Sequence, residues 1–124
     1  MKKGLTASES EEQQALFEWA ALKSGNFSEL SLMFHIPNEG KRSKSYGGRL
    51  KAEGLKAGVP DIFLPVARGN YHGLFIEMKS NKGKVLESQL CWLEQLRTQG
   101  FKTVVCYGWV EAAAVIEKYL QGVI

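Results

Sequence analysis

The chain has 124 residues, of which 44% are hydrophobic and 23% charged, so its composition is that of one globular domain with a single core. Its apolar runs fall short of the roughly 20 residues of a membrane-spanning helix, and no apolar stretch of a secretory signal follows the basic start Met1–Thr6. Cys91 and Cys106 have neither CxxC nor Cys/His spacing, which argues against a zinc finger or a disulfide framework and predicts a cytoplasmic protein.

The net charge of +3 is distributed unevenly along the chain. Residues 41–84 carry 10 basic and 3 acidic side chains, whereas residues 1–40 carry 3 basic and 6 acidic ones. A positive middle third suits a polyanion such as nucleic acid. A solvated lysine-rich surface would give the same count, so charge alone leaves both interpretations open.

The first half of the chain predicts one helix, one strand and a basic loop. Ser8 and Glu11 have the spacing of a capping box, and apolar residues then recur at helical spacing, which predicts a helix over residues 8–23. The alternating segment Leu30–Ile36 predicts a strand. Residues 38–58 contain five glycines and six Lys or Arg, and predict a basic loop with a short helical piece around Leu50–Leu55.

The second half predicts a regular alternation of strands and helices. Strands are expected within Val59–Val66, Tyr71–Lys79 and Thr103–Tyr107, and helices over Leu86–Gly100 and Val110–Leu120. The predicted order is α-β-β-β-α-β-α. A strand–helix–strand crossover near its end favours an α/β fold, with a mixed β-sheet flanked by helices.

Two predicted strands carry a pair of carboxylates and an amine. Asp61 begins one strand, while Glu77 and Lys79 lie two residues apart on the next and therefore share a face. A hairpin turning near Gly69 would bring Asp61 beside Glu77. Two neighbouring carboxylates stay ionised at neutral pH only with a neutralising partner such as a divalent cation. Oxygen ligands of this kind suit Mg²⁺ or Mn²⁺.

This constellation has the chemistry of phosphodiester hydrolysis. A metal held by Asp61 and Glu77, with the Met78 carbonyl as a further ligand, could polarise a phosphodiester and activate a water molecule. Lys79 could orient that water or neutralise charge in the transition state. The plainer alternative is an exposed Glu77–Lys79 ion pair of little energetic value. No GxxxxGK[ST] motif is present, so no nucleotide cofactor is expected, and His35 and His72 are interpreted as structural or surface residues.

The order of these motifs resembles that of the VRR-NUC (virus-type replication-repair nuclease) family, which belongs to the PD-(D/E)xK nuclease superfamily. The resemblance rests on Gly54–Asp61, on Phe75–Lys79 and on Gln89. It extends to Ser8, Glu9, Gln13 and Trp19, which are similar to the family's opening helix, and to the turn Pro37–Gly40. It covers nearly the whole chain and implies a single domain over residues 1–124, with a restriction-endonuclease-like core of the stand-alone phage or bacterial type.

The resemblance also implies individual roles. Asp61 and Glu77 would be metal ligands together with the Met78 carbonyl, Lys79 would be the catalytic lysine, and Gln89 would contact the active site or the phosphate. Glu9 matches the acidic residue of the first helix that completes the metal site. Glu11 and Glu12 are so close that they remain alternatives to Glu9, and acidic residues in a first helical turn also stabilise the helix dipole.

The basic residues around these motifs are expected to bind the DNA backbone, since Lys and Arg neutralise phosphates without reading bases. They are Lys41, Arg42, Lys44, Arg49, Lys51, Lys56, Lys82 and Lys84.

The expected function is that of a Mg²⁺- or Mn²⁺-dependent DNA endonuclease in replication, repair or recombination. Branched DNA such as a Holliday junction is the expected substrate, and a two-fold homodimer would place two active sites on a two-fold junction. The alternatives are a flap, single-strand-end or restriction-like nuclease, and a catalytically inactive DNA-binding module.

Overall fold

The computed structural model describes residues 7–37 and 44–124, which form a four-stranded sheet with helices on both faces. The strands lie in the order β1 (Phe34–His35), β2 (Ile62–Leu64), β3 (Leu74–Lys79) and β4 (Lys102–Tyr107). The first three strands pair antiparallel, and β4 pairs parallel to β3. The predicted α/β fold with a mixed sheet is therefore confirmed.

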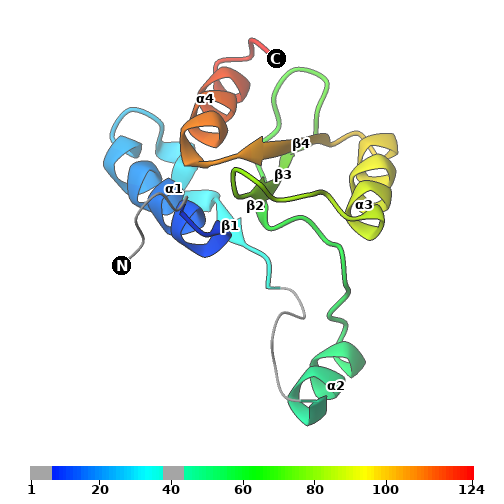
Figure 1. Ribbon diagram of the computed structural model, residues 1–124. Coiled ribbons are helices and arrows are strands. Elements are labelled where there is room, and N and C mark those ends of the chain that lie inside the picture. Colours follow the sequence, from blue (N-terminus) through cyan, green and yellow to red (C-terminus); the bar gives the residue numbers. More distant parts are fainter. Residues whose placement is uncertain (1–6, 38–43) are drawn as a thin grey trace.

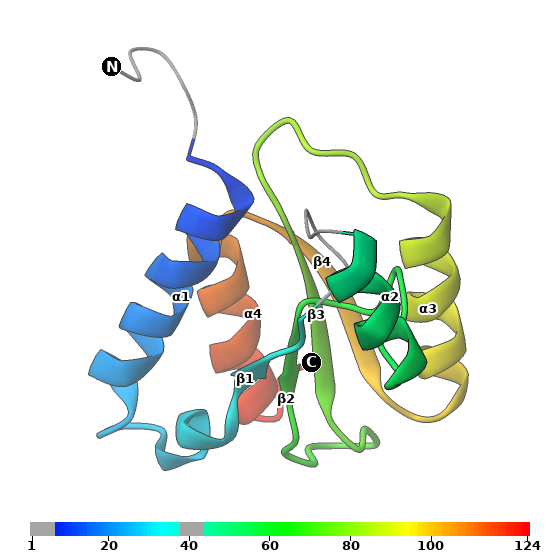
Figure 2. The ribbon, with the colours of Figure 1, turned by 90° about the horizontal axis from the view of Figure 1, so that it is seen from below.

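The helices lie on opposite sides of this sheet. Helices α1 (Glu9–Lys23) and α4 (Trp109–Leu120) pack side by side on one face, and α3 (Glu87–Thr98) lies on the other, where it connects β3 to β4 (Figure 2). Helix α2 (Lys44–Ala52) stands away from the sheet (Figure 1). Within the described residues, none of the helices combines the length and apolarity needed to cross a bilayer.

Strand β3 lies in the middle of the molecule, and all six of its residues are buried. Leu74, Ile76 and Met78 belong to the main hydrophobic core beneath α1 and α4. On the opposite face, the ring of Phe75 stacks on that of Phe63, with centroids 4.2 Å apart. Because side chains alternate along a strand, the face of Phe75 is also the face of the polar residues at the carboxyl end of β3.

The predicted strand over Leu30–Ile36 is largely wrong. A 3₁₀ helix, η1 (Ser28–Leu32), occupies its first half, and β1 has only two residues. Leu30 and Met33 are buried, and their spacing of three matches the turn of a 3₁₀ helix. Leu32 is 52% exposed, so the apolar alternation in the sequence does not form a buried strand face.

The helical piece expected around Leu50–Leu55 begins earlier, since α2 runs from Lys44 to Ala52. Gly54, with φ 111°, follows the helix, and the N–H of Leu55 donates to the carbonyl of Leu50 at 2.9 Å. This is the glycine-terminated helix end that closes a last turn. The other predicted helices and strands are confirmed, with ends shifted by a few residues.

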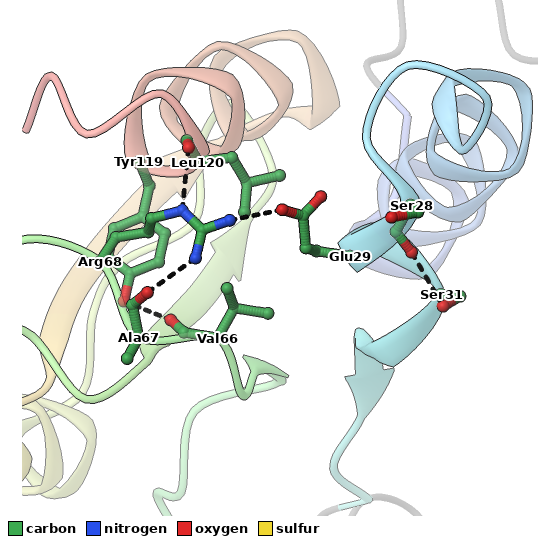
Figure 3. Close-up of polar contacts among 8 residues, drawn as sticks. All are labelled: Ser28, Glu29, Ser31, Val66, Ala67, Arg68, Tyr119 and Leu120. Atoms are coloured by element: carbon green, nitrogen blue, oxygen red, sulfur yellow. Dashed lines mark hydrogen bonds and ion pairs between the residues drawn. The ribbon is translucent and has the colours of Figure 1, made fainter.

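A hydrogen-bonded arginine links the turn between β2 and β3 to η1 and to the end of α4 (Figure 3). The Arg68 guanidinium donates to the carbonyls of Leu120 and Ala67, at 3.0 and 2.8 Å, and pairs with the Glu29 carboxylate. We call these four residues the Arg68 cluster. It joins η1, the β2–β3 turn and the end of α4, so the hairpin is held at its closed end.

Candidate active site

Asp61, Glu77 and Lys79 meet at the open end of the β2–β3 hairpin. The antiparallel register pairs Ile62 with Ile76, so Asp61, one residue before β2, lies opposite Glu77. Lys79 Nζ lies 3.5 Å from Glu77 Oε2. The exposed fractions are 8% for Asp61, 1% for Glu77 and 5% for Lys79. The structure therefore brings together the three residues that the sequence singled out, and we call them the carboxylate–lysine cluster.

Two buried carboxyl groups lie close together in this cluster, and their ionised forms are destabilised. Burial, followed by repulsion from the Asp61 carboxylate, raises the pKa of Glu77 to about 8. Burial also raises the pKa of Asp61, against the opposing effects of the Met78 N–H and the Lys79 charge. Glu77 Oε1 is buried and has no hydrogen-bond partner among the described residues, and a buried polar atom of this kind is normally hydrogen-bonded. A positive charge at Glu77 Oε1 would relieve both the repulsion and the missing contact.

The donor atoms at this edge of the sheet are oxygens. The Met78 N–H donates to Asp61 Oδ2 at 2.7 Å. In a strand the N–H and C=O of one residue point to the same side, so the Met78 carbonyl also faces Asp61. Among residues 7–37 and 44–124 no group of three or more His, Cys, Asp or Glu side chains has the arrangement of a metal site. Two carboxylates with a carbonyl nevertheless fit Mg²⁺, which commonly takes one or two carboxylates and keeps several waters.

A cavity of about 220 Å³ opens onto this cluster. Its lining comes from α1, β1 and the β2–β3 edge, and includes Glu9, Ser10, Gln13, His35, Asp61 and Met78. Glu9 Oε2 lies 4.0 Å from Lys79 Nζ. The cavity thus gives a solvent-borne group access to Asp61, while Glu77 and Lys79 lie buried beside it.

The three acidic residues of the first helical turn have different positions. The Glu11 carboxylate accepts from the Ser8 N–H at 2.8 Å and completes the capping box of α1. Glu12 Oε1 accepts from the Trp109 N–H at 2.7 Å, at the start of α4. Glu9 is the one that lies beside Lys79 and lines the cavity. The geometry therefore favours Glu9, the residue that the sequence resemblance selected, over its two neighbours.

Sequence reasoning missed the place of His35 in the site and gave Gln13 no role beyond the resemblance. His35 Nδ1 lies 3.1 Å from the Asp61 carbonyl oxygen and 3.0 Å from Gln13 Nε2, and both side chains line the cavity. The i,i+4 spacing of Glu9 and Gln13 could have placed Gln13, because such residues share a helix face. His35 carries no comparable signal, since its position depends on the pairing of β1 with β2.

Gln89 has a structural contact of its own. Its Oε1 accepts from the Leu86 N–H at 2.8 Å, in the capping box at the start of α3. In the structure, Gln89 therefore caps the start of α3. The resemblance implied a different role, contact with the active site or the phosphate.

The basic segment between Ile36 and Asp61, which we call the α2 segment because it carries α2, is attached directly at the site. The Ile36 N–H donates to the Asp61 carbonyl at 2.7 Å, so the two ends of this segment meet beside the carboxylate–lysine cluster. Trp92 Nε1 donates to the Ala57 carbonyl at 3.0 Å and fastens the segment to α3. Gly58 has φ 91°, and a Cβ there would lie 2.9 Å from the Ser88 carbonyl oxygen, so this close approach requires glycine.

Five of the predicted DNA-binding residues are exposed in the structure: Arg49, Lys51, Lys56, Lys82 and Lys84. Lys44 begins α2, and its side chain lies outside the described part of the structure, as do Lys41 and Arg42 altogether.

Comparisons with known proteins identify the family of the chain. Residues 7–109 match the VRR-NUC domain, and this range contains the carboxylate–lysine cluster, Glu9 and Gln89. A solved structure described as a VRR_NUC domain protein is similar to this chain with 29% sequence identity and a TM-score of 0.78, over 94% of this chain and 90% of that one. The comparison with curated proteins gives no match. The chain belongs to the VRR-NUC domain family.

Proposed function

We propose that this member of a nuclease family is a Mg²⁺- or Mn²⁺-dependent DNA endonuclease, and that residues 1–124 act as one nuclease domain. The observation that carries the proposal is the buried Glu77 Oε1, which lies beside a second carboxylate and has no hydrogen-bond partner within residues 7–37 and 44–124. A protein that only bound DNA would gain nothing from two acids near a phosphate, and their repulsion would weaken binding. A divalent cation turns the same pair into a phosphate-binding site.

The proposed roles follow from where each residue lies in the site. Asp61 and Glu77 hold the cation together with the Met78 carbonyl, and Glu9 reaches the cluster from α1. When bound, the ion polarises the scissile phosphodiester and makes its water more acidic. Lys79, held 3.5 Å from Glu77 Oε2, orients the attacking water or offsets charge on the phosphate in the transition state.

Hydrogen bonds from neighbouring residues keep Asp61 in place. His35 Nδ1 and the Ile36 N–H both reach the Asp61 carbonyl oxygen, while the Met78 N–H binds its carboxylate. These contacts restrict the backbone and the side chain of Asp61 independently. Such fixing of a metal ligand by its neighbours supports affinity and geometry at metal sites.

The proposed substrate is branched DNA, with a Holliday junction as the main candidate. The α2 segment joins the rest of the chain beside the site, and α2 itself stands away from the sheet, where its basic residues would contact DNA that extends beyond the scissile phosphate. Phosphate contacts from this segment and from Lys82 and Lys84 would hold DNA without reading its bases. A two-fold homodimer in the cytoplasm of its host would set two such sites on a two-fold junction.

A cleavage assay on four labelled substrates tests the proposal. Four-way junction, flap, linear duplex and single strand are incubated with Mg²⁺ or Mn²⁺, with EDTA and the Asp61→Asn variant as controls. Paired symmetric nicks in the junction, absent in both controls, are expected. Preferred cutting of flaps or single strands would support the alternative nuclease specificity, and binding without cleavage in either metal would contradict the enzyme proposal.

A further inference from the structure

A second cavity lies at the carboxyl ends of β3 and β4, outside the lining of the carboxylate–lysine cluster. Its volume is about 360 Å³, within the range of pockets that take small organic groups. The residues that define its chemistry are Glu12, Asn81, Tyr107, Trp109 and Val110. Neither the metal site nor the basic α2 segment uses this cavity.

The cavity adjoins Lys79 through two sets of contacts. The parallel register of β3 and β4 pairs Lys79 with Tyr107, so the two side chains share one face of the sheet. The Gly108 N–H donates to the Lys79 carbonyl at 3.1 Å. Asn81 follows Lys79 by two residues. The cavity therefore borders the backbone at the end of β3, next to Lys79.

The lining favours a flat, neutral group with hydrogen-bonding edges. Tyr107 is 44% exposed, Trp109 is partly buried, and aromatic rings of this kind stack on nucleobases. The exposed Asn81 amide offers both donors and an acceptor. Among the described residues, those that line the cavity include Glu12 and no Lys or Arg, which disfavours a phosphate there.

We propose that this cavity, the Tyr107–Trp109 pocket, takes an unpaired nucleobase of the DNA strand whose phosphate lies at Lys79. The base stacks on the aromatic rings, and the Asn81 amide binds its edge. The inference rests on the proposed nuclease function, because the phosphate at Lys79 is what positions the base. A base must leave the duplex stack to enter a pocket, so the pocket favours DNA whose bases unstack easily at the point of cleavage, as they do at a branch point.

Binding without metal tests the pocket separately from catalysis. The full chain in EDTA is titrated against a short fluorescent oligothymidylate and against an abasic oligomer with the same number of phosphates. The wild type should bind the base-bearing oligomer more tightly. Tyr107→Ala should weaken that binding about five- to 100-fold, as expected for one lost base–aromatic stack. It should leave the Kd of the abasic oligomer unchanged, and Tyr107→Phe should keep the wild-type values.

Asn81→Ala provides an independent variant at an exposed loop position, where folding is not at risk. It should weaken binding of the base-bearing oligomer alone, by less than Tyr107→Ala does. Leu22→Ala, at an 85% exposed position elsewhere on α1, is the control and should change neither Kd. Equal losses on both oligomers, or no loss with either pocket variant, would overturn the proposal.

The outcome is separable from that of the proposed function. Cleavage that depends on Asp61, with base-independent binding in every variant, would retain the nuclease and reject the pocket. Base-dependent binding that Tyr107→Ala abolishes, in a protein that cuts none of the four substrates, would retain the pocket and reject the nuclease.

Discussion

The two ends of the β2–β3 hairpin carry buried or partly buried ionic groups of opposite character. At the closed end, the nitrogens of Arg68 donate to two carbonyls and to the Glu29 carboxylate. At the open end, Asp61 and Glu77 face each other in a buried position, and Glu77 Oε1 has no hydrogen-bond partner in the part of the chain that the structure describes.

The difference separates stability from function. The Arg68 cluster engages each of the three guanidinium nitrogens and joins three elements, which is what a stabilising contact does. The carboxylate–lysine cluster places two acids where burial raises the pKa of both, which destabilises the ionised form of the folded chain. Unfavourable local electrostatics of this kind point to a functional site rather than to a structural one.

The largest expected effect is that of Glu77→Gln on activity. The substitution keeps the shape of the side chain and removes a metal ligand's charge, so cleavage should fall at least about 100-fold. Because it also removes the repulsion with Asp61, the melting temperature in EDTA at pH 8 should stay the same or rise. Cleavage assays and thermal melts measure the two effects. A variant that loses stability while keeping activity would break the comparison.

Lys79→Met is expected to lower the cleavage rate by about 100-fold, because it removes charge stabilisation from the transition state. Metal affinity should stay nearly unchanged, since Lys79 contributes no ligand atom. Single-turnover cleavage measures the rate, and calorimetric titration with Mg²⁺ measures the affinity. Lys79→Arg, which keeps the charge with a different shape, is the matched variant. A large loss of Mg²⁺ affinity in Lys79→Met would contradict the separate roles of the lysine and the acids.

Arg68→Met should have the opposite pattern, a loss of stability with no change in activity. Loss of its hydrogen bonds should lower the free energy of unfolding by about 1–2 kcal/mol, near the low end for charged groups because the guanidinium is partly exposed. The cleavage rate of the folded variant should equal that of the wild type. Urea denaturation gives the stability, and Arg68→Lys should recover part of it. A cleavage defect at full stability would show that the closed end also shapes the active site.

A pH dependence of stability is also expected in the metal-free protein. Glu77 keeps its proton in the folded chain up to about pH 8, whereas its ordinary pKa is 4.5. The contribution of this proton is therefore complete below pH 4.5 and is lost as pH rises through 8. Thermal melts in EDTA should show wild type losing stability over this window relative to Glu77→Gln. Parallel pH profiles for the two proteins would contradict the raised pKa.

Much of the fold was readable because local patterns and tertiary packing agree. The capping box at Ser8 and Glu11 set the start of α1, and the apolar runs at Leu74 and Val104 became the parallel pair β3 and β4. The alternation over Leu30–Ile36 misled, because Leu30 and Met33 pack at a spacing of three while Leu32 and Phe34 face solvent. A short apolar run carries no information about which of its residues another element will cover.

The sequence alone determined which groups could do chemistry and where along the strands they lie. Asp61, Glu77 and Lys79 follow from a hairpin and the two-residue period of a strand, which are local properties. Only the tertiary structure decided that Glu9, rather than Glu11 or Glu12, lies beside Lys79, and that His35 and Gln13 line the same cavity. These placements depend on how α1 and β1 pack against the sheet, and such long-range packing is set by the whole core rather than by neighbouring residues.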